Sequence, residues 1–420
     1  MRRLLALFLF FALGLAAERV YVAPDDGVGY LKELIRSAER EIDLALYLWT
    51  RGRLDLAEEM ARARLRGVRV RVILDERPGG EPQDPKVLAV LKGSDVQVRF
   101  ASPLRFANYH IKAMRVDDRL WISSSNWTRS SFERNREYSL VTDREGWVAE
   151  FKKLFEADWQ GKALALDDAL LVWSPERVYS LFRPFWEGNA KRRVLELVHE
   201  ARRDLLIEQN GLTDEDIFEA LLEAMDRGVR VRVLGSASAR NSGYFGRMAR
   251  RLGEEGAEVR FLEGLKVHAK AMLVDGETAF LGSQNFTPTA FTQNRELGAV
   301  LRKGGALSRL ASAMEADWRR AAPWRQAPKG VIPWSEAGRY LGLTVTVEGR
   351  VLGVRDAGGV YRLVFDEEES FVVVIPKRDA ARFPLGEYPG RVVRVTGLVR
   401  SYRGRPEIVA KSPLQIEVVR

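Results

Sequence analysis

Residues His268–Glu296 read HAKAMLVDGETAFLGSQNFTPTAFTQNRE, and the earlier residues His110–Glu137 read HIKAMRVDDRLWISSSNWTRSSFERNRE. Each stretch opens with His-x-Lys and runs through apolar residues to an Asp. Each then passes through hydroxyl-bearing residues to an Asn and closes on Asn-Arg-Glu. The chain contains three histidines in all, and two of them head these copies. Chance is a poor explanation for scarce residues in matched surroundings, so we take the two stretches as the organising feature of the chain.

Other segments of the chain repeat at a similar distance. These pairs are Arg66–Val72 with Arg227–Val233, Val98–Phe100 with Val259–Phe261, and Glu156–Trp159 with Glu315–Trp318. An offset of about 160 residues is too long for a solenoid period and indicates a duplicated domain. We expect one copy in residues 18–165 and the other in 166–322. Two such copies can meet across a pseudo-two-fold axis within a monomer, as the subunits of an isologous dimer do, and bring both His-x-Lys elements together.

The apolar pattern of the first copy predicts alternating strands and helices. The expected strands are 19–23, 42–48, 68–74 and 96–100, and the expected helices are 30–38 and 54–65. The run at 42–48 is nearly continuous, as in a strand that is buried on both faces. This alternation predicts a layered fold of the α/β class.

The residue composition and the apolar pattern of the sequence change after residue 322. Residues 323–334, PWRQAPKGVIPW, contain three prolines and are predicted to be a linker. Residues 335–420 contain about five short alternating β runs separated by turn residues. They predict a small all-β barrel, and residues 343–418 resemble OB-fold modules.

The N-terminal residues 1–17, MRRLLALFLFFALGLAA, have a basic start, an apolar core and small residues at the end. This is the pattern of a cleaved signal peptide. The alternative is a short membrane anchor, but the apolar run is shorter than the ~20 residues that a span requires. We therefore expect a secreted or periplasmic protein with no stable membrane insertion after cleavage. The formal charge of +9 favours polyanionic partners, and the absence of cysteine excludes disulfides and thiolate metal sites.

The repeated motif carries residues suited to phosphodiester chemistry. A His can attack phosphorus or move protons near neutral pH. A Lys two residues later lies on the same face of a strand and can hold a phosphate oxygen. The Asn can donate to another such oxygen, and the closing Glu can fix the tautomer of a His. The candidate catalytic residues are His110, Lys112, Asn126 and Glu137 in one copy and His268, Lys270, Asn285 and Glu296 in the other. Ligands for a transition metal are scarce, so no metal is expected.

These residues resemble the HKD motif of the phospholipase D superfamily. The second copy matches His-x-Lys-x4-Asp-x6-Gly-Ser-x-Asn at every fixed position. The first copy has Ser123 where Gly is expected and is one residue shorter between Asp117 and Ser124, a loss that we assign to the hairpin turn. By this resemblance Asp117 and Asp275 are structural residues, and Ser124 and Ser283 support the site.

The resemblance implies a duplicated α/β/α sandwich that forms a pseudo-dimer. It also implies a metal-independent reaction without a cofactor, through a phosphohistidine. His110 would be the nucleophile and His268 the general acid and then base, although the residues alone do not order the two. His199 lies in a helical run and is expected to be a surface or packing residue.

The motif does not separate nucleases from lipid enzymes, so the substrate is inferred from the C-terminal segment. An OB-type barrel suggests an exported nuclease with DNA or RNA as its partner. The candidate nucleic-acid-binding residues are Tyr361, Arg400, Tyr402, Arg403 and Arg405. The alternative is a phospholipase D or phosphatidyltransferase, and the lack of membrane helices after residue 17 argues against cardiolipin synthase. A non-catalytic nucleic-acid binder is a third class, but a binder has no need for paired histidines.

Overall fold

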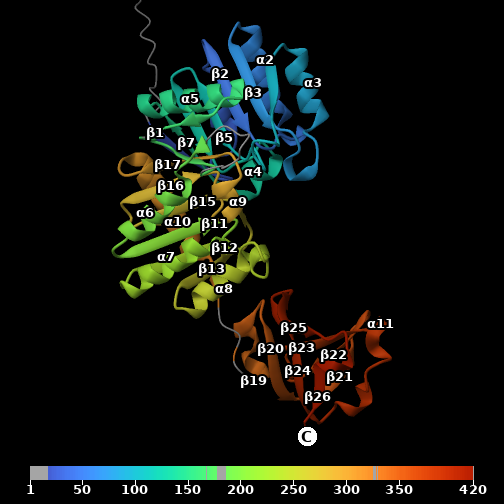
Figure 1. The fold of residues 1–420 in the computed structure, drawn as a ribbon. Helices are drawn as coiled ribbons and strands as arrows, with labels where there is room; N and C mark the ends of the chain where they lie inside the picture. Colours follow the sequence, from blue (N-terminus) through green and yellow to red (C-terminus); the bar gives the residue numbers. More distant parts are fainter. Residues whose placement is uncertain (1–17, 167, 177–185, 325–327, 329, 420) are drawn as a thin grey trace, which may run out of the picture. The chain divides into compact units, whose positions relative to one another are not determined.

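The computed structural model describes residues 18–419 apart from 167, 177–185, 325–327 and 329 (Figure 1). These residues form two compact units, one ending at Pro323 and the other beginning at Trp324, so the boundary falls within the predicted linker. The predicted signal peptide lies outside the described residues. Within them, no helix combines the length and the apolar character needed to cross a membrane.

The first half of the first unit is a mixed sheet with helices on both faces. Its elements are β1 (Glu18–Ala23), α1 (Gly29–Arg36), β2 (Glu41–Leu46), α2 (Leu54–Leu65), β3 (Arg69–Asp75), α3 (Pro85–Gly93), β4 (Gln97–Ala101), β5 (Lys112–Val116), β6 (Arg119–Ser123), α4 (Arg129–Glu133), β7 (Asn135–Thr142) and α5 (Glu145–Gln160). The strand order is β1-β7-β6-β5-β2-β3-β4. Helices α1 to α3 pack on one face and α5 on the other, so the central strands are buried on both faces, as the apolar run of β2 predicts.

The second half repeats this arrangement. Its elements are β9 (Val172–Ser174), α6 (Ala190–Glu200), β11 (Asp204–Gln209), α7 (Glu215–Asp226), β12 (Arg230–Ser236), α8 (Gly246–Glu254), β13 (Glu258–Leu262), β14 (Lys266–Val267), β15 (Lys270–Val274), β16 (Thr278–Gly282), α9 (Pro288–Thr292), β17 (Glu296–Leu301), α10 (Gly305–Arg320) and β18 (Ala322–Pro323). The strand order β9-β17-β16-β15-β11-β12-β13 matches that of the first half, and β18 is added at the β13 edge. A short parallel pair joins β8 (Leu164–Ala165), which follows α5, to β10 (Trp186–Glu187), which follows β9. The predicted duplication and α/β class are confirmed.

The motif hairpins are held by an Asp in the turn of each half. Asp117 follows β5 with φ +49°, and Asp275 follows β15 with φ +53°. The Asp117 carboxylate accepts the backbone N–H groups of 39, 40 and 41, and the Asp275 carboxylate accepts those of 202, 203 and 204. Each Asp therefore ties its hairpin to the start of a central strand. Two residues join the first pair of strands and three join the second, which places the missing residue in the turn as expected.

The two halves share a core and exchange contacts at their interface. Strand β14 of the second half pairs with β7 of the first, and one apolar cluster contains residues from both halves. Arg136 of the first Asn-Arg-Glu segment bonds Asp317, with contacts of 2.6 and 3.1 Å. Arg295 of the second segment bonds Asp158, with contacts of 2.9 and 3.1 Å. All four side chains are buried, so the repeated Arg and Asp residues lock one half onto the other.

The C-terminal unit is a separate β domain with its own apolar core. Its elements are β19 (Val331–Pro333), β20 (Thr344–Arg350), β21 (Gly353–Asp356), β22 (Val360–Val364), β23 (Val372–Pro376), α11 (Lys377–Ala380), β24 (Val392–Tyr402), β25 (Arg405–Val409) and β26 (Ile416–Val418). The strand order is β19-β20-β24-β25-β23-β22-β21, and β26 pairs with β24. The fold therefore changes, as predicted, from α/β in the first unit to mainly β in the C-terminal unit.

We predict that Asp317→Ala lowers the free energy of unfolding of the first unit by about 3–5 kcal/mol, because it leaves Arg136 buried without its main counter-charge. Chemical denaturation of the wild type and the variant measures the difference. Glu258→Ala is the matched control, since its partner Arg230 is half-exposed and such pairs contribute about 0–1 kcal/mol. Equal losses in the two variants would contradict an interface role for Asp317.

Candidate active site

The eight candidate catalytic residues lie where the two halves meet. His110 and His268 directly precede β5 and β15, whose first residues are the two motif lysines. The asparagines follow β6 and β16, and the two glutamates lie at the starts of β7 and β17. Strand periodicity places the His and the Lys of each motif, two residues apart, on the same side of their segment. Both lysines and both glutamates are fully buried.

Each histidine is held by the glutamate of the other copy. The Nδ1 atom of His110 lies 2.8 Å from the carboxylate of Glu296, and the Nδ1 atom of His268 lies 2.8 Å from that of Glu137. The pairing is crossed, which sequence spacing does not reveal, because each copy contains a His and a Glu at matched positions. One half alone would lack the acid that orients its own His. In both pairs Nε2 is left as the nitrogen that can react.

The motif lysines are buried beside the histidines. The Nζ atom of Lys112 donates to the main-chain carbonyl of His110 at 2.6 Å, and that of Lys270 donates to the carbonyl of His268 at the same distance. Burial lowers the pKa of Lys112 to about 7, with the Glu296 charge opposing the shift. Burial likewise lowers the pKa of Lys270 to about 8, against Glu137. The two ammonium groups are therefore poorly solvated cations that a phosphate anion would stabilise.

Burial also lowers the pKa of both motif histidines. The pKa of His268 is lowered to about 4 by desolvation, although the Glu137 charge acts to raise it. The pKa of His110 is lowered well below its usual range by desolvation and then by the charges of Lys112 and Lys270. A carboxylate contact by itself acts to raise the pKa of a His. In this largely buried site with two lysines nearby, desolvation outweighs that effect and lowers the pKa of both histidines.

The two glutamates contact the two serines that the resemblance implies as supporting residues, and also two asparagines that the motif comparison did not single out. Asn135 donates to Glu137 at 3.3 Å, and Asn294 donates to Glu296 at 3.1 Å. Ser124 donates to Glu137 at 2.6 Å, and Ser283 bonds Glu296. Each residue of the repeated Asn-Arg-Glu segment thus has a distinct contact. The Asn donates to the Glu, and the Arg binds an Asp of the other half.

Further residues break the symmetry of the site. The ring of Tyr47, just after β2, lies 4.6 Å from the ring of His110, and the Nζ atom of Lys112 lies 5.1 Å from the Tyr47 ring centroid. The matching position in the second half is Asn210, since both main-chain N–H groups bond the residue after the motif His. Sequence reasoning missed Tyr47, which could have been found as the residue that follows a buried strand at its carboxyl end.

The remaining predicted site residues are placed as follows. The amide oxygens of Asn126 and Asn285 are buried without a hydrogen-bond partner. Across the described ranges, no cluster of His, Cys, Asp and Glu is arranged to hold a metal ion. His199 lies on α6 with its side chain half-exposed and 3.4 Å from Glu223, as expected for a surface residue.

A family model described as "Cardiolipin synthase, PLD-like domain" matches residues 31–159 and 194–318. The chain belongs to this family. It is therefore a member of the phospholipase D superfamily, and the resemblance carried by the two HKD motifs is confirmed.

Curated relatives and solved structures agree with this placement. The chain is 24% identical to cardiolipin synthase A of Erwinia tasmaniensis over 334 residues, which is 71% of this chain and 68% of that protein. It is 23% identical to cardiolipin synthase A of Yersinia pseudotuberculosis over 333 residues, with the same coverage. A phosphatidylserine synthase from Haemophilus influenzae has a similar fold, with a TM-score of 0.55 at 13% identity, over 73% of this chain and 87% of that one. A polyphosphate kinase from Porphyromonas gingivalis also matches, with a TM-score of 0.55 at 14% identity, over 73% of this chain and 48% of that one.

These relatives overturn the expectation of a nuclease with DNA or RNA as its partner. The relatives are named as lipid synthases, and the similarity includes both motif-bearing halves. The error came from assigning the substrate through the C-terminal segment, because the HKD chemistry is common to all phosphodiesters. The argument against cardiolipin synthase from missing membrane helices was also wrong, since the similarity lies in the α/β halves.

The residues chosen for a nucleic-acid groove have other surroundings in the C-terminal unit. Arg400 is neutralised by Glu407 at 2.6 Å. Tyr361 lies under the Lys377 ammonium group, 5.4 Å from ring centroid to nitrogen. Tyr402, Arg403 and Arg405 lie in or beside one hairpin turn, where Arg403 has φ +52°. Because the relatives are cardiolipin synthases, the prediction that these five residues bind nucleic acid is withdrawn.

We predict that Glu137→Gln lowers kcat on the soluble diester bis(p-nitrophenyl) phosphate by about 10²–10⁴-fold, as the loss of a His-orienting carboxylate does elsewhere. The substitution removes the charge that opposes desolvation, so the pKa of His268 should fall below about 4. Nitrophenolate release and histidine NMR titration measure the two effects. Glu277→Gln, at an exposed ion pair with Arg203, is the control and should change kcat by no more than about twofold.

A second prediction concerns stability against pH. Burial raises the pKa of Glu296 from 4.5 to about 8, with Lys112 opposing. A raised folded-state pKa gives stability that is fully present below about pH 4.5 and is lost as the pH rises through about 8. The Tm of the wild type should therefore fall by at least about 4 °C relative to Glu296→Gln between pH 5 and 8.5. Differential scanning calorimetry across that range measures it, and a constant difference would contradict the buried, proton-binding carboxyl.

Proposed function

We propose that this protein is a phosphatidyltransferase that breaks and re-forms a phosphodiester bond of a phospholipid through a phosphohistidine. The observation that carries the proposal is the crossed pairing, which fixes the Nδ1 atoms of His110 and His268 on buried carboxylates. It gives two oriented imidazoles in one site, which is what a two-step transfer needs. The likeness to cardiolipin synthases over 71% of the chain supports a phospholipid as the substrate.

The reaction follows from the positions of the two imidazoles. In the first step Nε2 of neutral His110 bonds to phosphorus, the bond from phosphorus to the leaving alcohol breaks, and His268 gives that oxygen a proton. The negative charge of the bound diester raises the pKa of His268 and supplies the protonated form. In the second step His268 takes the proton of an acceptor hydroxyl, whose oxygen bonds to phosphorus as the phosphorus–nitrogen bond breaks. The order of the histidines follows the superfamily resemblance.

Lysine and asparagine pairs would stabilise the charge on the transferred phosphoryl group. Lys112 and Lys270 are close enough to interact electrostatically with both histidines. In a buried site of low dielectric, such cations act more strongly on a developing charge than they would in water. Asn126 and Asn285 add neutral donors from the loops that follow β6 and β16.

We also propose that the C-terminal unit is an OB-type barrel. Its topology supports this, because β20 pairs with β24, β21 to β23 form a meander, and β23 runs parallel to β25. Strands β20 and β21 are separated by Val351 and Leu352 alone, so they can act as one bent strand that closes such a barrel. All eight motif residues belong to the other unit.

Vesicles that contain phosphatidylglycerol test the proposal. Transfer of a phosphatidyl group to the glycerol of a second lipid yields cardiolipin and free glycerol, whereas transfer to water yields phosphatidic acid, and mass spectrometry separates these products. We predict cardiolipin formation by the wild type and a loss of at least about 10³-fold in both His110→Ala and His268→Ala, because the two act as a unit. His199→Ala is the control and should keep wild-type rates.

Cleavage of the soluble diester without any lipid product would contradict the proposed function. The protein would then be a phosphodiesterase that acts on a substrate other than a phospholipid. Phosphatidic acid as the sole lipid product would make the protein a phospholipase D instead of a transferase.

A further inference from the structure

The outer edge of the first sheet is open where the same edge of the second sheet is covered. In the second half, β18 pairs with β13 at Arg260 and Phe261, and Phe261 is 1% exposed. The repeated Val-Arg-Phe of β4 pairs with β3 alone among the described strands, and Phe100 is 42% exposed. Duplicated sequence thus leaves an aromatic ring on the surface in one copy and buries it in the other.

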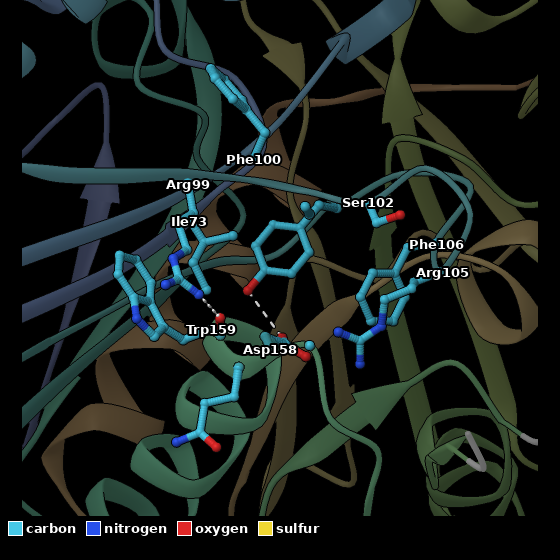
Figure 2. Close-up of a pocket in the computed structure, with 12 residues that line it drawn as sticks. Ile73, Arg99, Phe100, Ser102, Arg105, Phe106, Asp158 and Trp159 are labelled. Atoms are coloured by element: carbon cyan, nitrogen blue, oxygen red, sulfur yellow. Dashed lines mark hydrogen bonds between the residues drawn. The ribbon is translucent and has the colours of Figure 1, made fainter. Parts of the chain in front are cut away.

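A pocket of about 240 Å³ lies at this open edge (Figure 2). The guanidinium of Arg99 lies 4.4 Å from the ring centroid of Trp159 and bonds its main-chain carbonyl. Arg105 lies across the pocket and donates to the carbonyl of Lys162 at 2.7 Å. In Figure 2 the ring of Phe100 points away from these two cations, at the rim of the pocket. The edge therefore combines aromatic walls with guanidinium groups.

Charge at the edge is positive. Arg99 and Lys162 are exposed, and within the part of the chain that the structure describes neither forms an ion pair with a carboxylate. Asp158 also lines the pocket, but its carboxylate is bonded by Arg295 and by the hydroxyl of Tyr109. An approaching anion would thus meet cations without a competing free carboxylate at this point.

The edge continues into a loop that leads to the catalytic centre. Leu104 in this loop is 72% exposed. The N–H of Ala107 bonds the carbonyl of Gln293, Asn108 bonds Asn294 at 3.0 Å, and His110 follows two residues later. The loop is therefore held at its base by the second Asn-Arg-Glu region while its tip exposes an aliphatic side chain.

We propose that Arg99, Phe100, Leu104 and Lys162, which we call the edge patch, dock the protein on an anionic phospholipid bilayer. Apolar side chains that enter the interface while neighbouring cations meet lipid phosphates are the chemistry of peripheral membrane binding. A peptide that added a strand to β4 would cover Phe100 but not Leu104, which lies on a loop. The inference rests on the proposed function, since a phospholipid substrate requires contact with a lipid surface.

Vesicle sedimentation with the full-length protein tests the edge patch. The vesicles contain phosphatidylcholine alone or with phosphatidylglycerol. We expect the wild type to bind the anionic vesicles, and the double variant Phe100→Asp/Leu104→Asp to bind them at least about tenfold more weakly. Arg99→Gln/Lys162→Gln should weaken binding most at low salt, because charge attraction is screened by ions. Leu65→Asp is the matched control, since Leu65 is 82% exposed between two arginines at the end of α2 and should bind as the wild type does.

Turnover of bis(p-nitrophenyl) phosphate by the double variant should equal that of the wild type, which shows that the fold and the catalytic centre are intact. Wild-type binding to anionic vesicles that is lost in the double variant supports the edge patch even if no lipid product forms, in which case the proposed function fails alone. The edge patch is overturned if the wild type does not bind these vesicles or if the double variant binds equally well. It is also overturned if the double variant keeps vesicle binding but changes the oligomeric mass, because the edge is then a protein interface.

Discussion

The exchange of glutamates between the two copies is the constraint on which the rest of the first unit depends. Each motif His contacts the Glu of the opposite copy at 2.8 Å, and that distance requires the two sheets to meet in one register. The buried contacts of Arg136 with Asp317 and of Arg295 with Asp158 fix this register from both sides. Each Asn-Arg-Glu segment thus supplies, in adjacent positions, a carboxylate that contacts a motif His and a cation that binds the other half. The geometry of the candidate site and the stability of the interface therefore depend on the same short segments.

The site contains charged side chains whose burial costs desolvation free energy. Two lysines, two glutamates and two histidines share a region that solvent barely reaches, and desolvation shifts the pKa values of both lysines downward. An anionic diester would relieve part of this cost by supplying the counter-charge that the lysines lack. Substrate binding and protonation of the site are therefore linked. Tyr47 on one side and Asn210 on the other make the surroundings of the two imidazoles unequal.

Much of the fold could be predicted from the sequence because its signals are local. Apolar runs located the central strands, and the shortened turn at Asp117 was visible as a missing residue. The crossed pairing could not be predicted, since two equivalent glutamates satisfy the same spacing rule whichever copy they serve. The direction of the histidine pKa shifts depends on burial, which only the three-dimensional packing sets. The substrate class was predicted wrongly because a phosphodiester site does not encode the groups attached to the phosphate.

The crossed pairing also has a consequence for the chain while it is being synthesised. The ribosome makes the first half, with Glu137 and Asp158, long before it makes His268 and Arg295, the partners of those two acids. Domains generally fold as they emerge, yet this half emerges with two acids whose partners in the second half have not yet been made. His268 finds its partner Glu137 in the half that is already made, but His110 cannot be oriented until Glu296 has been made. A chain released before residue 296 therefore lacks the oriented pair of histidines, and the composite site is assembled only when both halves are present.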